Sequence, residues 1–245
     1  MKDIPTLGGT FAFAQCANNQ GQVIGQSNLT GDVGCNGSLQ FCAQHAFSWV
    51  HGTLTDLGTL GGSFSQAIWV NNAGEAVGSA LTAGDEEFHA TVWRNGKITD
   101  LGTFDRDCFS QAIAINEKGQ VVGQSFSCDF STVRTVLWDN GAITDLKVAT
   151  APFEPLNIND RGEITGVELP PACSDSNLCG RAFLLIPCAS GQGCKGKDSF
   201  SPQIESRTTG STLTQRRELT KEFVAQLRAR LAQRYRIPGR GAQRN

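Results

Sequence analysis

A repeated sequence pattern constrains the fold of this chain more than any other feature. Three segments align with one another, beginning at His45, His89 and Arg134, at intervals of about 45 residues, which is the length of one four-stranded propeller blade. Each segment contains a β-former-rich run ending near a tryptophan, then Thr-Asp-Leu, then a turn of the form Asn-x-x-Gly. We therefore predict that one repeat of about 45 residues forms one folding unit.

The two ends of the repeat region are incomplete in complementary ways. Residues 3–27 match the second half of a unit, and residues 181–186 match only its opening strand. If the last strand completed the first blade, no sheet edge would be left exposed. The sequence thus predicts an all-β fold: a four-unit β-propeller-like ring of four-stranded antiparallel blades over residues 1–188, closed by the N- and C-terminal strands.

Turn residues support this reading. Asn95-Gly96 and Asn140-Gly141 each separate two runs of β-forming residues, and Asn-Gly is a strong signal for a two-residue hairpin because both residues tolerate positive φ. The Asn-x-x-Gly turns are predicted to join the remaining strands of each unit. They begin at Asn18, Asn71, Asn116 and Asn159.

Nine cysteines in a chain of this size indicate an oxidising compartment. Eight of them are near neighbours in loops, and proximity suggests the pairs Cys35 with Cys42, Cys108 with Cys128, Cys173 with Cys179, and Cys188 with Cys194. Cys16 is left over and is expected to be a buried free thiol. Zinc is the alternative, but the sequence has no Cys-x-x-Cys pair or histidine partner at ligand spacing, so we expect no metal site.

These disulfides predict an extracellular or cell-surface location. The residues after Met1 show no charged segment followed by an apolar one, so we expect the export signal to have been removed or to lie outside this sequence. No run of about 18 apolar residues predicts a membrane span.

Three recurring motifs resemble a known family. His45-Ala46-Phe47, the Asp-Leu-Gly-Thr-Leu-Gly-Gly segment at residues 56–62, and Ile-Asn-x-x-Gly-x-Val-Val-Gly-x-Ser at residues 115–125 are similar to the HAF-repeat family of extracellular bacterial proteins. The resemblance covers roughly residues 1–187, and the segment that begins at Arg134 departs from it. The resemblance implies secretion and a repeat architecture, but no defined activity.

Residues that recur in every unit are interpreted as structural. Asp3, Asp56, Asp100 and Asp145 occupy one repeat position and are expected to accept local backbone hydrogen bonds rather than to form a catalytic ring. His45 and His89 share another position, where arginine replaces histidine in the later units, so a hydrogen-bonding role is favoured over catalysis. Tryptophans 49, 93 and 138 also recur and are expected in the core.

Function is therefore expected in the segments that differ between units, because loops on a rigid scaffold carry specificity. Four such segments, residues 28–44, 81–88, 126–133 and 168–180, should lie on one face of the ring. The candidate ligand-binding residues are the acidic and aromatic ones among them, together with the unrepeated tryptophan: Trp69, Asp85, Glu86, Glu87, Phe88, Phe126 and Phe130.

Two functions compete. The first is a secreted binding or structural surface module for a glycan or protein ligand, without a cofactor, which the absence of nucleophile and phosphate-loop motifs favours. The second is an extracellular polysaccharide hydrolase or lyase, for which a general acid and a base must converge. Its candidate acids are Asp85, Glu86, Asp105 and Asp107.

The C-terminal segment differs in charge from the repeats. Residues 1–199 carry a net charge of −9, and residues 200–245 carry +7. Residues 189–210 are predicted to form a Gly/Ser-rich linker. Residues 211–245 are predicted to form a basic amphipathic helix, with a stripe of Leu219, Phe223, Leu227 and Leu231. We expect this helix to dock on the acidic ring of its own or a neighbouring chain, to lie on an anionic membrane or polymer surface, or to be a disordered basic tail. Nucleic acid is the least favoured partner, because the repeats are acidic.

Overall fold

The computed structural model describes residues 3–31, 43–147, 153–168 and 180–187, and within them the chain forms fifteen β-strands and no helix. The strands are β1 (Gly8–Ala17), β2 (Gln22–Leu29), β3 (Gln44–Val50), β4 (Thr53–Asp56), β5 (Gly61–Val70), β6 (Ala76–Thr82), β7 (Phe88–Arg94), β8 (Lys97–Asp100), β9 (Phe109–Ile115), β10 (Val121–Phe126), β11 (Val133–Asp139), β12 (Ala142–Asp145), β13 (Phe153–Ile158), β14 (Ile164–Glu168) and β15 (Arg181–Leu185).

Consecutive strands pair antiparallel in four groups that follow the repeat. We call β1–β4 unit I, β5–β8 unit II, β9–β12 unit III and β13–β15 unit IV. A single parallel pairing between Gln44 of β3 and Phe64 of β5 joins units I and II into one eight-stranded sheet. The repeat therefore predicted the strands correctly, but each hydrogen-bonded unit is shifted by half a repeat from the segments that begin at His45, His89 and Arg134.

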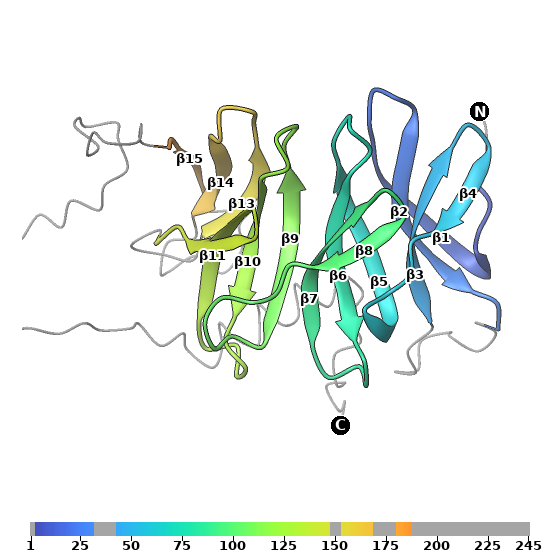
Figure 1. Cartoon of the computed structure of the whole chain (residues 1–245), viewed down its shortest axis with the longest axis horizontal. Helices are drawn as coiled ribbons and strands as arrows, with labels where there is room; N and C mark the ends of the chain where they lie inside the picture. Colours follow the sequence, from blue (N-terminus) through green and yellow to red (C-terminus); the bar gives the residue numbers. More distant parts are fainter. Residues whose placement is uncertain (1–2, 32–42, 148–152, 169–179, 188–245) are drawn as a thin grey trace, which may run out of the picture.

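The predicted closed ring is wrong. The strands form three sheets, of eight, four and three strands, and none of them closes. Strand β15 pairs with β14, from Ile164↔Leu185 to Glu168↔Arg181, and not with residues 3–8. The physical reason is that β3 and β4, which follow directly in the sequence, already complete unit I, so β15 has no missing strand to supply there. The four units follow one another along the long axis, with units I and IV at opposite ends (Figure 1).

The predicted hairpin turns are confirmed. Asn95-Gly96 connects β7 to β8 with φ angles of 52° and 71°, and Asn140-Gly141 connects β11 to β12 with 49° and 80°. Both residues of each turn lie in the left-handed region, as a type I′ hairpin turn requires. These tight turns fix the pairing of the third and fourth strands in units II and III.

The Asn-x-x-Gly turns do more than connect strands. In the first three of these turns the asparagine side chain also reaches the next unit, forming what we call the asparagine ladder. Nδ2 of Asn18 donates to the Asn71 carbonyl oxygen at 2.9 Å, Asn71 donates to Asn116 at 3.1 Å, and Asn116 donates to Asn159 at 2.9 Å. The recurrence of asparagine thus reflects contact between units as well as turn geometry.

A second row of hydrogen bonds runs beside the asparagine ladder. The backbone N–H of Asn19 donates to Oδ1 of Asn72, that of Asn72 to Oε1 of Glu117, and that of Glu117 to Oδ1 of Asp160, at 3.0, 2.9 and 2.9 Å. Each bond runs from one unit to the next in the same direction. At each of the three contacts between units, the earlier unit therefore supplies the donors and the later unit the acceptors.

Apolar side chains fill the spaces between units. Val77 and Val92 of unit II pack with Ile115, Val121 and other residues of unit III, and equivalent clusters lie between units I and II and between units III and IV. Of the repeated tryptophans, those at positions 93 and 138 are buried, as predicted, whereas the one at position 49 in unit I is half-buried. The core is therefore divided between the interfaces instead of surrounding one axis.

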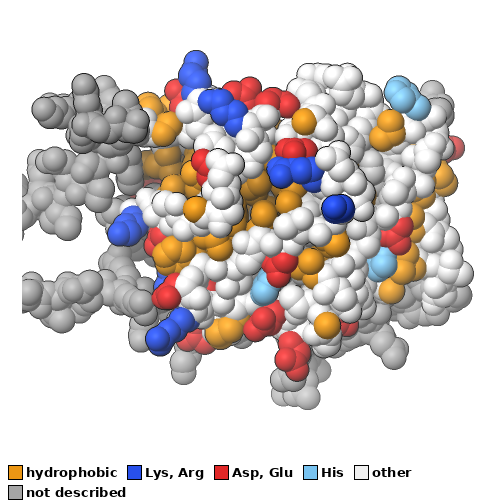
Figure 2. Space-filling model, in the orientation of Figure 1, with side chains coloured by type: hydrophobic (Ala, Val, Ile, Leu, Met, Phe, Trp, Pro, Cys, Tyr) orange, Lys and Arg blue, Asp and Glu red, His pale blue; other side chains and the backbone are white. Residues whose placement is uncertain are grey.

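The predicted linker and basic helix, residues 189–210 and 211–245, lie outside the described residues, and their proposed contacts stay predictions. On the face of the described units that Figure 2 shows, acidic and basic side chains lie among hydrophobic and uncharged polar ones. In this part of the chain no helix has the length and apolar character to cross a membrane.

Candidate functional site

The candidate site involves the loop that joins the second and third strands of each unit, whose sequence differs between units. These connections fall within the four segments that the sequence singled out, and they join β2 to β3, β6 to β7, β10 to β11 and β14 to β15. Residues 32–42 and 169–179, in the first and last of them, lie outside the described residues. The loops of units II and III can therefore be compared directly.

These two loops share one backbone form. In unit II, the N–H of Thr82 donates to the Glu87 carbonyl at 2.9 Å, and in unit III, Ser127 donates to Thr132 at 3.0 Å. Inside each loop one non-glycine residue has a positive φ, 61° at Asp85 in unit II and 60° at Phe130 in unit III. The two loops are therefore structural equivalents that carry different side chains.

In unit II the loop is held to the start of β5 by a carboxylate. Asp85 accepts hydrogen bonds from the Ser63 N–H at 2.7 Å and from the Ser63 hydroxyl at 2.8 Å. Asp85 thus has a tethering role, whereas its neighbour Glu86 is exposed. Of the predicted acidic cluster, Glu87 turns instead toward His89, with its Oε2 3.5 Å from Nε2.

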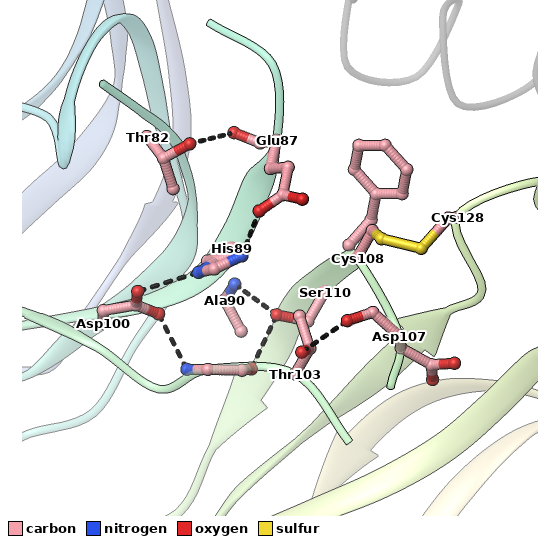
Figure 3. Close-up of polar contacts among 12 residues, drawn as sticks. Thr82, Glu87, His89, Ala90, Asp100, Thr103, Asp107, Cys108, Ser110 and Cys128 are labelled. Carbon is pink, nitrogen blue, oxygen red and sulfur yellow. Dashed lines mark hydrogen bonds and ion pairs between the residues drawn. A yellow bond between two sulfur atoms is a disulfide. The ribbon is translucent and has the colours of Figure 1, made fainter. Parts of the chain in front are cut away.

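His89 lies between two carboxylates (Figure 3). Its Nδ1 is 2.8 Å from Oδ2 of Asp100, and the other oxygen of Asp100 accepts the Gly102 N–H at 2.7 Å. The hydrogen bond to Asp100 raises the pKa of His89 despite partial burial, and the charges of Asp100 and Glu87 raise it further. Burial alone would raise the pKa of Asp100, but the hydrogen bonds from His89 and Gly102 lower it.

The same pair recurs in unit I, where His45 Nδ1 is 2.8 Å from Oδ2 of Asp56. Asp56 accepts the Gly58 N–H at 2.8 Å, and Asp145 of unit III accepts the Lys147 N–H at 2.9 Å. The predicted structural role of these repeated residues is confirmed at the three positions, because each aspartate accepts a hydrogen bond from the backbone two residues ahead.

Unit III replaces this pair with a different one. Arg134 stands where the other units have histidine, and its guanidinium is paired with Asp107 instead of Asp145. Asp107 is buried and also accepts the Ser125 hydroxyl at 2.7 Å. The Arg134 guanidinium lies 5.8 Å from the centre of the Phe104 ring. The segment from Thr103 to Ser110 is one residue longer than the equivalent segment of unit II, from Thr59 to Ser65, and Asp107 lies in it.

A disulfide replaces the carboxylate tether in unit III. Cys108 is bonded to Cys128, with their Cα atoms 4.8 Å apart, which confirms that predicted pair (Figure 3). The other predicted pairs, Cys35 with Cys42, Cys173 with Cys179 and Cys188 with Cys194, lie outside the described residues. Cys16 is a free thiol, as predicted, but it is half-buried instead of fully buried.

The altered side chains of unit III surround a polar pocket of about 400 Å³. It opens between the segment that precedes β9 and the loop between β10 and β11. Its lining residues are Asp105, Arg106, Asp107, Ser127, Ser131, Thr132 and Arg134. Asp105 and Arg106 are exposed at its rim, whereas Asp107 and Arg134 form its mostly buried base. The lining offers both hydrogen-bond donors and acceptors.

The side chains of the aromatic candidates pack inward, including that of Phe130, which belongs to the unit III loop. Phe126 is fully buried and Phe88 nearly so, and they form one cluster with Phe109 and the half-buried Phe130, in which the centres of contacting rings lie 4.6 to 6.4 Å apart. Trp69 is half-buried and packs against the apolar clusters on either side of unit III. These side chains support the site from within.

The sequence predicts only part of the pocket. The functional segment 126–133 contains Ser127, Ser131 and Thr132, although none of the three is singled out. Asp105 and Asp107 are predicted only as possible catalytic acids, and Arg106 and Arg134 are not predicted as binding residues. The available signal was the loss of the repeat pattern itself: a one-residue insertion and an arginine at the histidine position, both in unit III. Among the described residues, no group of three or more His, Cys, Asp or Glu side chains could hold a metal ion.

Comparison with known proteins assigns no family to the chain. Neither the protein-family models nor the curated proteins include a match to this sequence. The similarity to HAF repeats stays a prediction, and the functional argument depends on the geometry of the pocket in unit III.

Proposed function

We propose that the chain is a secreted binding module that holds a glycan in the unit III pocket. The observation that carries the proposal is that the pocket is formed by the residues with which unit III departs from the repeat. Ser127, Ser131 and Thr132 supply hydroxyl groups, Asp105 a carboxylate and Arg106 a guanidinium. Each sugar hydroxyl is both a donor and an acceptor, so a lining of this mixed kind matches its hydrogen-bonding needs.

The base of the pocket supports positioning more than catalysis. Glycoside hydrolysis uses two carboxyl groups, one on each side of the scissile bond. Of the two acids that line the pocket, Asp107 is already paired with Arg134 and bonded to Ser125. Asp105 is therefore the one acid of the lining that is exposed, and a single available carboxyl group fits binding better than bond cleavage.

The Cys108–Cys128 disulfide is relevant to the cellular location of the protein. A bond between Cys108 and Cys128 persists in oxidising environments and is uncommon in a reducing cytosol. It weakly supports the predicted extracellular location, and so does the similarity to HAF repeats. Both features agree with a module that meets glycans outside the cell.

A glycan array with the purified protein tests the proposal. Arg106→Ala and Asp105→Ala remove exposed groups at the rim and should weaken binding at least tenfold while the far-UV circular dichroism spectrum is unchanged. Glu86→Ala is the matched control, because Glu86 occupies the place of Ser131 in the equivalent loop of unit II, outside the pocket. Binding that the two rim variants leave unchanged, or release of sugars from a bound polysaccharide, would contradict the proposal.

A further inference from the structure

The two ends of the row of units carry surfaces that are buried everywhere else. All five exposed large hydrophobic side chains among the described residues belong to units I and IV, and none belongs to unit II or III. They are Phe13, Val50, Leu156, Leu184 and Ile186. The distribution indicates that exposure follows from the position of a unit in the row.

Unit I exposes the face that the other units turn toward their predecessor; we call it the leading face. Ile115 and Ile158, in units III and IV, are 2% and 3% exposed, because each packs on the preceding unit. Their equivalent in unit I is Ala17, which is exposed. Ala14 is exposed in the same way, and Trp49 is half-buried. The leading face is thus an apolar surface without a described unit in front of it.

Unit IV exposes the opposite face, which we call the trailing face. Val92 of unit II is 4% exposed beneath unit III, whereas its equivalent in unit IV, Leu184, is 50% exposed. Val122 of unit III is fully buried beneath unit IV, and its equivalent Thr165 is exposed. No described unit follows this face. Threonine at this position makes the trailing face less apolar than the inner interfaces.

The ladders end in complementary hydrogen-bonding groups. Asn159 donates one Nδ2 hydrogen to Glu163 of its own unit, as the inner asparagines do to the equivalent residues of theirs. The inner asparagines donate the second Nδ2 hydrogen to the following unit, whereas within the described residues Asn159 has no such acceptor. The backbone N–H of Asp160 is the corresponding donor in the second row. At the other end, the Asn18 carbonyl and the Asn19 side chain correspond to the acceptors of the inner units. The trailing face therefore carries hydrogen-bond donors, and the leading face carries the matching acceptors.

We propose that a second copy of this chain docks its trailing face on the leading face, continuing the interface that joins the units within one chain. A leading face placed against another leading face would bring acceptors against acceptors, so the contact is head-to-tail. Such a contact is heterologous and leaves one free face of each kind, so it can propagate beyond a dimer. Because Thr165 and Ala17 are smaller or more polar than the residues of the inner interfaces, the association is reversible and depends on concentration.

Analytical ultracentrifugation of the full chain over a hundredfold range of concentration tests this. The wild-type weight-average mass should rise with concentration from the monomer value of 26.2 kDa. Ala17→Arg places a charge on the leading face and Leu184→Arg places one on the trailing face. Because both residues are exposed, the fold should tolerate either change, which circular dichroism verifies. Each variant alone should stay a monomer.

Mixing the two variants gives the decisive measurement. The trailing face of Ala17→Arg and the leading face of Leu184→Arg are both intact, so the mixture should form a one-to-one dimer of twice the monomer mass and nothing larger. Thr99→Arg, an exposed change on β8 away from both faces, should behave as wild type. A wild-type chain that stays monomeric, for instance because residues 188–245 cover a face, would overturn the proposal. So would one variant that dimerises by itself, or a mixture that stays monomeric.

Discussion

Units II and III solve the same structural problem with different chemistry. Both hold a six-residue loop of one backbone form against the strand beside it. Unit II does so with the Asp85 carboxylate on Ser63, and unit III with the Cys108–Cys128 disulfide. Once the tether is covalent, the loop of unit III no longer needs an acid at the Asp85 position, where Phe130 instead packs inward. The comparison teaches that the backbone of a repeat can stay fixed while its side chains become available for a pocket.

The buried ion pair gives the largest expected difference between the two units. In Asp107→Ala the Arg134 guanidinium would lie at the base of the pocket without its partner, and removing one member of a buried pair costs about 3 to 5 kcal/mol. Urea denaturation should show a fall in the free energy of unfolding near the lower end of this range, because Arg134 is 15% exposed. The unit II counterpart, Asp100→Ala, removes a more exposed carboxylate and should cost much less. If Asp107→Ala and Asp100→Ala lowered the free energy of unfolding equally, the two units would not differ in the way proposed.

The covalent tether should rank next. Replacing both Cys108 and Cys128 by serine releases a loop closed over a sequence separation of 20 residues. Loss of this constraint on the unfolded chain should lower the free energy of unfolding by about 3 kcal/mol. Dithiothreitol should destabilise the wild type more than the double variant, by a similar amount. A double variant as stable as the oxidised wild type would show that the disulfide does not constrain unit III.

The carboxylate tether of unit II should have a smaller effect. Asp85→Ala removes two hydrogen bonds to Ser63 at an exposed site, so we expect a loss of about 1 kcal/mol. Asp85→Asn, which keeps an acceptor oxygen, should recover part of it. Thermal unfolding of the three proteins gives the measurement. A loss as large as that of the cysteine double variant would mean that the two tethers are equivalent in strength.

The smallest effect concerns pH. The pKa of His89 is raised in the folded chain above its ordinary value of 6.5, chiefly by its hydrogen bond to Asp100. Its contribution to stability is therefore full at pH below 6.5 and is lost as the pH rises through the raised value. We expect less than about 1 kcal/mol, because the site is partly exposed.

Nuclear magnetic resonance titration of the His89 ring protons measures this pKa directly. Glu87→Gln should lower it, because the charge of Glu87 contributes to the shift. In unit III the equivalent position holds arginine, which stays charged over this range, so its ion pair should show no such dependence. If the pKa of His89 were the same in Glu87→Gln as in the wild type, the Glu87 carboxylate would not contribute to raising it.

The sequence predicted the strands and turns of this fold better than it predicted their grouping. Asn-Gly and Asn-x-x-Gly turns have local causes, so they could be recognised without tertiary information. A periodic sequence, however, shows the length of a repeat and not where each sheet begins. The half unit over residues 3–27 was therefore assigned to a ring closure, although β3 pairs with it directly.

The site was less predictable for a different reason. Proximity in the sequence was enough to suggest Cys108 with Cys128. It was not enough to show that Phe126 points into the core, which depends on packing between strands, or that Asp107 meets Arg134, which depends on the extra residue before Ser110. Searching the repeat for the unit that breaks its own pattern would have found the pocket.

The asparagine ladder has a consequence for how the molecule opens. Each of its bonds joins only adjacent units, so stability is approximately a sum of unit terms and nearest-neighbour terms, as in a one-dimensional chain of coupled elements. A unit at an end loses one neighbour contact when it unfolds, and a unit in the middle loses two. Amide hydrogen exchange should therefore be slowest around Asn71 and Asn116 and fastest in unit IV, with opening that proceeds inward from the ends.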